Sequence, residues 1–302
     1  MKPDLPVWRS LLYVPVNVTK YVDKAHERGA DCIQLDLEDS VPAAEKDKAR
    51  KLVPAAAARV RRGGADVVVR TNSPFEATVK DLEHAICADV DGIALTKAES
   101  PDHVKRIDEA IGKLEAKRGI KAGHTRLIAM IETPAAFFQM PAIAAACERL
   151  AAMNIGGEDF ALETGMEPLE ETLLMPKQQM IFAARAAGIL PLGFIASVAG
   201  FGDWEAFARM VRRSRRFGFM GASCIHPGQV PIVNREYSPS AEELSHARRV
   251  IEENAAAEAA GRASFAIDGK MIDVPVVRRA ERLIARAAAI AAREAKKHSN
   301  PV

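Results

Sequence analysis

The chain has 302 residues, of which 48% are hydrophobic, 27% are charged and 5% are aromatic, and 42 Lys and Arg against 40 Asp and Glu leave a formal net charge of +2. This composition excludes collagen-like, disordered and disulfide-scaffold proteins, and the near-zero charge gives no bulk attraction to nucleic acid or to an anionic membrane. The length suits one large α/β barrel or two medium domains.

Short apolar runs alternate with longer amphipathic segments along most of the chain. The runs are brief and often β-branched, as is typical of parallel strands buried on both faces. The expected strands are 10–14, 32–37, 67–70, 92–95, 126–131, 151–155, 190–195 and 222–225. The expected helices are 21–28, 43–61, 75–88, 101–118, 134–148, 170–187, 203–217 and a short one after Pro227.

These eight strand–helix units favour a closed (β/α)₈ TIM barrel over a doubly wound sheet at this length. After the barrel, residues 240–260 are expected to form an amphipathic helix, 264–273 a hairpin with an Asp-Gly turn, and 276–297 an Ala/Arg-rich helix. The last helix carries interleaved glutamates and no aromatic residue, which favours a packed helix with a solvated face over an RNA- or membrane-binding one. We expect a barrel domain over 1–236 and a C-terminal helical and hairpin extension over 237–302.

The N-terminal segment and the cysteines predict a cytoplasmic protein. Residues 1–9 have no continuous apolar stretch, so a secretory signal is not expected, and no run of 18 apolar residues suggests a membrane span. The four cysteines form no CxxC motif and are expected to be reduced thiols, which suits the cytosol.

Polar side chains gather where the expected strands end, which is where catalytic groups of barrel enzymes lie. The opposite strand ends show no comparable set. Several carboxylates on one rim, with an arginine and a lysine, indicate a bound cation and an anionic substrate. The residues concerned are Asp36, Glu38, Asp39, Arg70, Lys97, Glu132, Glu158, Asp159 and His226.

Glu132 and Asp159 would face one opening from neighbouring strands. Two carboxylates with several remaining waters are a typical protein share for Mg²⁺, and the absence of nearby His or Cys argues against zinc. The alternative is that each acid caps the helix that follows it, since Glu132 precedes Thr133-Pro134 and Asp159 follows a glycine turn.

The other rim residues also have structural alternatives. Arg70 would clamp a substrate carboxylate or pair with Asp36 or Glu38. Glu38 and Asp39 would hold metal-bound water or begin a helix. Lys97 would contact substrate or form a rim salt bridge.

Two further features favour structural roles. His226 precedes Pro227 and is expected to be a cap. The pairs Gly63-Gly64 and Gly156-Gly157 match neither a dinucleotide-binding nor a P-loop pattern, so a nucleotide-phosphate loop is not supported.

Seven motifs, in order along the chain, resemble those of the citrate lyase β-subunit-like family within the HpcH/HpaI aldolase superfamily. Each is weak alone, but together they are specific. They are RSLLYVP (9–15), QLDLEDSVP (34–42), VVRTN (68–72), IAMIETP (128–134), NIGGEDF (154–160), CIHPGQV (224–230) and DGKMIDVPVVRRA (268–280). The chain departs from the family at Val16, where glycine is common, and over 191–203, where Gly193 stands near a usual aspartate.

The resemblance implies a (β/α)₈ barrel assembled as a homotrimer or a hexamer. It implies Mg²⁺, or Mn²⁺ in its place, held by Glu132 and Asp159, and a keto acid held by Arg70. In the related malyl- and citramalyl-CoA lyases the Asp of the MID segment acts from a neighbouring subunit, and this aspartate corresponds to Asp273. The C-terminal extension is therefore expected to contribute to a neighbouring subunit's site.

The expected function is Mg²⁺-dependent carbon–carbon cleavage of a 3-hydroxyacyl-CoA thioester, such as malyl-CoA or citramalyl-CoA, into a keto acid and an acyl-CoA. Asp273 and Arg70 would be catalytic, and Arg70, Glu38, Asp39 and Lys97 would bind substrate. The alternatives are a citrate lyase β subunit acting on citryl-acyl-carrier protein, a CoA-independent pyruvate aldolase, and a non-catalytic binding barrel. No nucleic-acid or membrane partner is expected.

Overall fold

The computed structural model describes residues 2, 4–197, 202–261 and 264–298. The chain divides into two compact units, a larger one of Met1–Tyr237 with Lys297–Val302 and a smaller one of Ser238–Lys296. Among the described residues, no helix is both long enough and apolar enough to cross a membrane.

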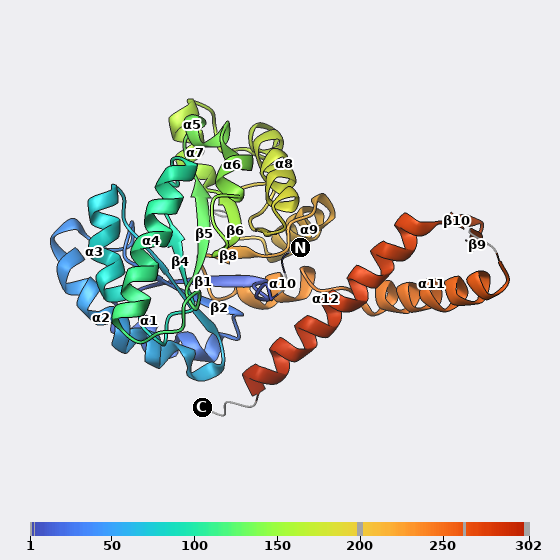
Figure 1. Cartoon of the computed structure of the whole chain (residues 1–302), viewed down its shortest axis with the longest axis horizontal. Coiled ribbons are helices and arrows are strands. Elements are labelled where there is room, and N and C mark those ends of the chain that lie inside the picture. The colour runs from blue at the N-terminus through green and yellow to red at the C-terminus, as the bar shows by residue number, and fades with distance from the viewer. Residues whose placement is uncertain (1, 3, 198–201, 262–263, 299–302) are drawn as a thin grey trace. The chain divides into compact units, whose positions relative to one another are not determined.

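Within the described part of the chain, the larger unit holds an eight-stranded parallel sheet in the order β7-β6-β5-β4-β3-β2-β1-β8 (Figure 1). A parallel bridge between Leu192, just after β7, and Gly221, just before β8, joins the two outer strands, so the sheet closes on itself. The predicted TIM-barrel fold is thus confirmed. The strands are β1 Ser10–Pro15, β2 Cys32–Asp36, β3 Asp66–Arg70, β4 Gly92–Leu95, β5 Arg126–Ile131, β6 Leu150–Ile155, β7 Leu190–Pro191 and β8 Ala222–Cys224.

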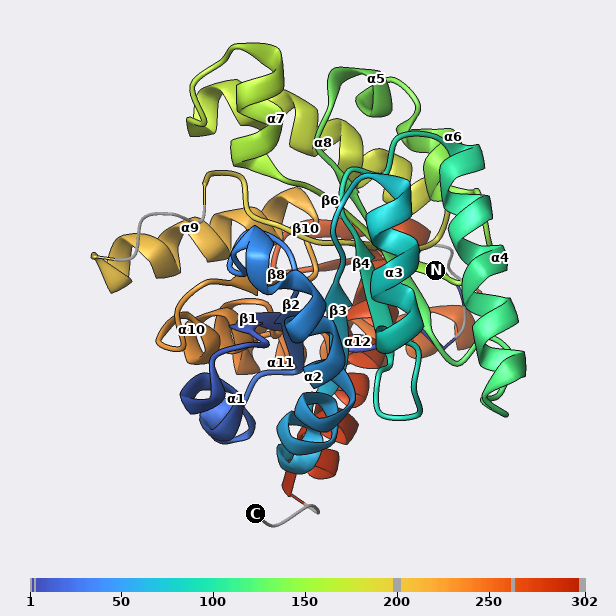
Figure 2. The same cartoon turned by 90° about the vertical axis from the view of Figure 1, so that its left-hand side faces the viewer.

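Helices connect successive strands and pack outside the sheet, where α2, α3 and α4 lie side by side (Figure 2). The α-helices of this unit are α1 Thr19–Ala25, α2 Lys46–Val60, α3 Phe75–Ala85, α4 Pro101–Lys117, α5 Pro134–Phe137, α6 Met140–Ala144, α7 Gly157–Thr164, α8 Glu170–Ala186, α9 Trp204–Phe217 and α10 Gln229–Glu236. Short 3₁₀ turns at His26–Arg28, Ala43–Glu45 and Arg61–Gly63 flank α1 and α2.

The elements differ from the sequence expectation in three places. The helix expected over 134–148 is two short helices, α5 and α6, because Pro141 lies in the first turn of α6 and lacks the N–H that a continuous helix would need there. Helix α7 is an additional helix that the expected set does not contain, and Gly165 ends it in a left-handed conformation. Strand β7 has two residues, whereas the apolar run suggested six over 190–195.

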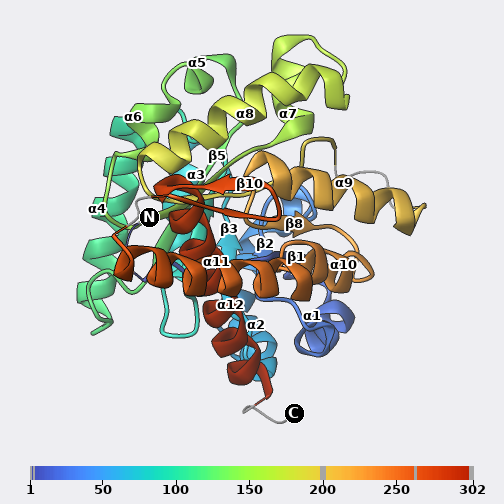
Figure 3. The same cartoon turned by 90° about the vertical axis from the view of Figure 1, so that its right-hand side faces the viewer.

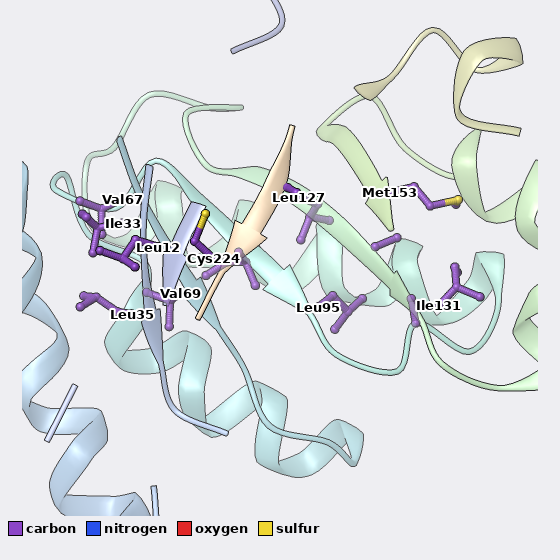
Figure 4. Close-up of a cluster of buried hydrophobic side chains, with 14 of the residues drawn as sticks. Leu12, Ile33, Leu35, Val67, Val69, Leu95, Leu127, Ile131, Met153 and Cys224 are labelled. Atoms are coloured by element: carbon purple, nitrogen blue, oxygen red, sulfur yellow. The ribbon is translucent and has the colours of Figure 1, made fainter. Parts of the chain in front are cut away.

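Strand side chains alternate between two cores, as a pleated backbone requires. One set packs between sheet and helices and includes Ile33, Leu35, Val67 and Val69 (Figure 4). The other set lies on the opposite face, inside the barrel, and includes Leu11, Cys32, Val68, Ala94, Ile128, Met130 and Ala152.

The smaller unit contains α11 Ala241–Ala259, the hairpin strands β9 Phe265–Ile267 and β10 Lys270–Ile272, and all but the last two residues of α12 Val274–His298 (Figure 3). Ser240 and Glu243 form a capping box at the start of α11. Asp268 and Gly269 both have positive φ, at 49° and 75°, which is the backbone of a tight hairpin turn. A small apolar cluster, including Val250, Ile267 and Ile272, holds this unit together.

Candidate active site

A group of polar side chains lies at one end of the barrel, on the same strand faces as the inner core. Val68, Met130 and Ala152 belong to the inner core. Two residues beyond each of them, on the same face, stand Arg70, Glu132 and Asn154. Because all strands are parallel, these residues meet at the carboxyl ends of the strands.

A cavity of about 960 Å³ opens at this end of the barrel. Its volume suits a small ligand with a bulky substituent. The cavity is lined by polar residues from the strands and the segments that follow them, and by basic residues from α1 and the turn after it. The first group includes Tyr13, Asp36, Asp39, Arg70, Glu132, Asn154 and, on α7, Asp159; the second is Lys20, Lys24 and Arg28.

Arg70 is held by Asp36 in a two-point ion pair, with Nε 2.7 Å from Oδ1 and Nη2 2.8 Å from Oδ2. Asp36 also accepts hydrogen bonds from the Ser40 hydroxyl at 2.6 Å and from the Glu38 backbone N–H at 3.0 Å. Burial alone would raise the pKa of Asp36, but Arg70 and these donors hold it below its usual value. Arg70 therefore forms the ion pair with Asp36 that the sequence allowed as an alternative. Its Nη1 group remains available to other partners.

Nη1 of Arg70 lies between two acids, 2.7 Å from Glu38 Oε2 and 3.2 Å from Asp39 Oδ2. The Glu38 contact is an ion pair without hydrogen-bond geometry, and Oε2 is a buried atom with no hydrogen-bond partner. Burial, together with the charges of Asp39 and Asp36, raises the pKa of Glu38 to about 7, although Arg70 opposes the shift. The Arg70 guanidinium carbon also lies 4.7 Å from the centre of the Tyr13 ring.

Glu132 is almost completely buried, with 2% of its surface exposed. Its Oε2 accepts a hydrogen bond from the backbone N–H of Lys97 at 3.0 Å. Burial first, and then the nearby charges of Asp159 and Glu38, raise the pKa of Glu132 to about 8. Lys97 thus contributes its backbone to this cluster, and its side chain is not among the described residues that line the cavity.

Gly156 lets the chain after β6 pass directly over Glu132. A Cβ at this position would lie 2.6 Å from Glu132 Oε1 and 2.8 Å from its Cγ, so no other residue fits without moving the carboxylate. Gly156 of the Gly156-Gly157 pair is therefore needed for packing against Glu132 and not for binding a nucleotide phosphate. It allows α7, which carries Asp159, to begin beside Glu132.

The oxygen atoms here fit a hard divalent cation. Glu132 and Asp159 influence each other electrostatically. Two buried oxygens beside them, Glu38 Oε2 and Asn154 Oδ1, have no hydrogen-bond partner, which is unusual for buried acceptors. Among the described residues no group of three His, Cys, Asp or Glu side chains has the geometry of a metal site. Two carboxylates completed by water and substrate are the share expected for Mg²⁺ rather than zinc.

Lys20, Lys24 and Arg28 form a basic row at one side of the cavity. All three are exposed, and Lys20 and Lys24 lie one turn apart on α1. The sequence reasoning did not select them. Their spacing of four residues, directly after the first strand, could have indicated a basic helix face at the carboxyl end of the barrel.

Two of the expected residues lie elsewhere or act locally. His226 lines the cavity, and its Nδ1 accepts a hydrogen bond from the Gly228 N–H at 3.0 Å, which caps the turn before α10. Asp273 belongs to the smaller unit, where it follows β10 and caps α12, with Oδ1 3.4 Å from the Val276 nitrogen.

The departures from the family pattern also have defined positions. Val16 is buried in the core between sheet and helices, with 3% of its surface exposed. Gly193 lines the cavity with φ of 135°, and a Cβ there would lie 3.1 Å from the Phe219 ring. Residues 198–201 of the altered segment are outside the described residues.

Comparison with known proteins gives consistent matches over most of the chain. The family model for HpcH/HpaI aldolase/citrate lyase matches residues 9–227. The citrate lyase subunit beta of Haemophilus influenzae is 34% identical over 282 residues, covering 92% of this chain and 96% of that protein. The human mitochondrial citramalyl-CoA lyase is 28% identical, covering 93% and 86%. The crystal structure of CitE from Mycobacterium tuberculosis with magnesium, acetoacetate and coenzyme A is 30% identical, with a TM-score of 0.73 and coverage of 94% and 99%.

Proposed function

The chain belongs to the HpcH/HpaI aldolase/citrate lyase family, and we propose that it is a Mg²⁺-dependent carbon–carbon lyase that cleaves, or in reverse forms, a 3-hydroxyacyl-CoA thioester. The observation that carries this proposal is the pair of carboxylates Glu132 and Asp159 in one cavity with Arg70, which Glu38 contacts. Burial and the charge of Asp159 raise the pKa of both Glu132 and Glu38, and the buried oxygens Glu38 Oε2 and Asn154 Oδ1 have no hydrogen-bond partner, so the arrangement suits a bound cation.

Glu132 and Asp159 would hold the metal, with Glu38 and Asn154 able to anchor its waters. When bound, Mg²⁺ supplies Lewis acidity toward the oxygen of the substrate and offsets the charge of the carboxylates. The Lys97 N–H and the close backbone of Gly156 keep the Glu132 carboxylate in place, so the site is formed before the substrate arrives.

Arg70 would orient the keto-acid half of the substrate through Nη1. Because Asp36 occupies Nε and Nη2, the guanidinium cannot rotate freely, and its remaining edge is presented in one direction. A substrate carboxylate would reach this edge in place of the exposed Asp39.

The basic row of Lys20, Lys24 and Arg28 would take the phosphates of coenzyme A. Three positive charges on the cavity side are suited to several phosphate groups. The thioester would then lie between this row and the carboxylates. This arrangement supports a CoA ester over a free hydroxy-keto acid.

In the cleavage direction the substrate hydroxyl gives its proton to solvent water and becomes the carbonyl of the keto acid, while Asp273 enters the step in its protonated form. The electron pair of the broken carbon–carbon bond passes to the acyl-CoA half as an enolate. Asp273 would protonate the enolate carbon, and in the reverse direction it would remove that proton. We propose that it does so from a neighbouring subunit of a homotrimer, as the resemblance to the malyl- and citramalyl-CoA lyases implies.

The citrate lyase β subunit is a second candidate, favoured by the 34% identity to the Haemophilus influenzae protein. Such an enzyme would act on citryl-acyl-carrier protein and would need partner subunits. A citryl thioester carries the phosphate of its carrier arm, so the basic row is compatible with it. A pull-down from the native host that recovers only this chain would argue against this candidate.

The test is to incubate the protein with Mg²⁺ and malyl-CoA or citramalyl-CoA and to follow products by mass spectrometry. We expect acetyl-CoA with a keto acid from at least one ester, loss of turnover in Glu132→Gln, and normal turnover in the surface variant Glu109→Gln. Turnover that survives Glu132→Gln unchanged would overturn the site, and no turnover of any 3-hydroxyacyl thioester would overturn the function.

A further inference from the structure

An aromatic ring from β1 packs against the guanidinium of Arg70, and the proposed function gives it no role. The Arg70 guanidinium carbon lies over the Tyr13 ring, 4.7 Å from its centre, which is within the range of a cation–π contact. Tyr13 is half-buried and lines the cavity. The ring is therefore next to the group that the proposed function assigns to the keto acid.

The barrel places these two side chains in one layer. In a (β/α)₈ barrel the inward residues of alternate strands form layers across the interior. Leu11 of β1 and Val68 of β3 both belong to the inner core. Tyr13 and Arg70 stand two residues beyond them, on the same faces of these strands. The contact between ring and guanidinium is thus set by two strands and does not depend on a loop.

Tyr13 restrains Arg70 in a direction that its acidic partners leave open. Asp36 holds Nε and Nη2 along one edge of the guanidinium, and an ion pair at one edge still lets the plane of the group tilt. A ring packed against the flat face of the guanidinium opposes this tilt. Burial raises the pKa of Tyr13 to about 12, although the charge of Arg70 opposes the shift, so the ring stays neutral and adds no further anion.

We propose that Tyr13 is a positioning residue for the keto acid, whose ring fixes the plane of the Arg70 guanidinium so that Nη1 meets the substrate carboxylate edge-on. The inference rests on the proposed function, because it takes the keto acid as the ligand of Arg70. Arginine binds a carboxylate through N–H groups that lie in the plane of the guanidinium, so a tilted plane weakens these bonds. The aromatic ring carries this role, and the hydroxyl does not.

The test separates the ring from its hydroxyl. Calorimetric titration of the Mg²⁺-loaded protein with pyruvate measures keto-acid binding without turnover, and titration of the metal-free protein measures Mg²⁺ binding. Tyr13→Phe should keep pyruvate affinity within about twofold. Tyr13→Leu and Tyr13→Met, which keep an apolar side chain but no ring, should lower it about 5- to 20-fold and change Mg²⁺ affinity less than about twofold.

The chain offers a matched control in a second pair of arginine and aromatic ring. The Arg106 guanidinium carbon lies 3.9 Å from the centre of the Phe75 ring. Phe75 is also half-buried, and it is not among the described residues that line the cavity. Phe75→Leu therefore removes the same kind of contact away from the site, and we expect wild-type affinity for both pyruvate and Mg²⁺.

Several results would overturn the assignment while the proposed function stands. Equal losses of pyruvate and Mg²⁺ affinity in Tyr13→Leu and Tyr13→Met would show that the ring only supports the cavity floor. A loss in Tyr13→Phe as large as in Tyr13→Leu would show that the hydroxyl acts instead. Wild-type pyruvate affinity in both variants without a ring would show that Asp36 alone fixes Arg70. Wild-type protein that binds no pyruvate with Mg²⁺ would overturn the proposed function and this inference together.

Discussion

Asp36 engages two nitrogens of Arg70, at 2.7 and 2.8 Å, and both residues stand at the carboxyl ends of adjacent strands in direct register. Asp36 lines the cavity, but both of its oxygens are already engaged, by Arg70, the Ser40 hydroxyl and the Glu38 N–H. Its role is to set the direction of the guanidinium. A residue that acts in this way influences catalysis only through its partner.

Asp36→Asn should therefore impair substrate use without touching substrate. The variant leaves Arg70 without its two-point partner, and we expect about 2 kcal/mol lower stability and about 10- to 100-fold lower kcat/KM, mainly through a raised KM. Chemical denaturation and steady-state kinetics measure the two effects. Asp23→Asn, which removes the surface partner of Arg59, is the control and should change neither by much. A drop in kcat with an unchanged KM would contradict a positioning role.

Much of this site follows from strand periodicity, and the rest depends on side-chain geometry. Arg70, Glu132 and Asp159 were predictable because parallel strands bring their carboxyl ends to one rim. The acid that pairs with Arg70 at two points could not be predicted. Asp36, Glu38 and Asp39 are close together in sequence, and only the orientation of their side chains in the structure distinguishes them.

The roles of Lys177 and Lys97 could not be predicted from the sequence either. In the sequence, Lys177 is one polar residue of the helix α8. In the structure it is 5% exposed with Nζ bonded to the Ala196 carbonyl, and this burial depends on how α8 packs against the segment after β7. Lys97 was expected to use its ammonium group, but it is the backbone N–H that reaches Glu132. Almost every residue type has a backbone N–H, so a contact of this kind cannot be predicted from the identity of the residue.

Metal affinity should rise with pH because of Glu132. Its pKa is raised from 4.5 to about 8 in the folded, metal-free protein, so between these values the folded state holds a proton that the unfolded state has lost. By linkage, this group makes the metal-free fold progressively less stable as pH rises from about 4.5 to about 8. Mg²⁺ must displace that proton, so its affinity should increase up to about tenfold per pH unit below about pH 8 and then level off.

Calorimetry in buffers of different ionisation enthalpy would count the proton released on binding. We expect release near pH 7 and almost none above about pH 9. Glu132→Gln should bind Mg²⁺ weakly and without this pH dependence. Affinity that falls as pH rises would contradict the assignment of Glu132 as a metal ligand.

Gly156→Ala should damage the metal site, because the added methyl group would stand 2.6 Å from Glu132 Oε1. Either the carboxylate or the backbone must move, and we expect a loss of about tenfold or more in Mg²⁺ affinity. Gly112→Ala in α4 is the matched control. There the nearest atom to the new Cβ is Arg149 Nη2 at 3.8 Å, and helix stability should rise by about 0.5–1 kcal/mol. Equal Mg²⁺ affinity in the two variants would show that Gly156 does not shape the site.

Charge reversal in the basic row should separate the two halves of the substrate. Lys20→Glu with Lys24→Glu should raise KM for a CoA ester at least about tenfold and make it less sensitive to salt. Binding of free pyruvate with Mg²⁺ should stay within about twofold, because the proposed function assigns the keto acid to Arg70 and the metal and not to this row. Reversal of Lys113 and Lys117, on the exposed end of α4, controls for net charge. An equal loss of pyruvate binding would place the row at the keto acid instead.

Asp273 and Glu132 should complement each other between subunits. If each site takes its metal carboxylates from one chain and Asp273 from a neighbour, Glu132→Gln and Asp273→Asn are each inactive, but mixed oligomers contain some sites with both residues intact. Unfolding and refolding the two variants together should restore partial activity, in proportion to the mixed species resolved by native mass spectrometry. Refolding each variant alone should restore none. Mixed oligomers without activity would show that Asp273 serves its own chain. An active Asp273→Asn homo-oligomer would show that Asp273 takes no part in the mechanism.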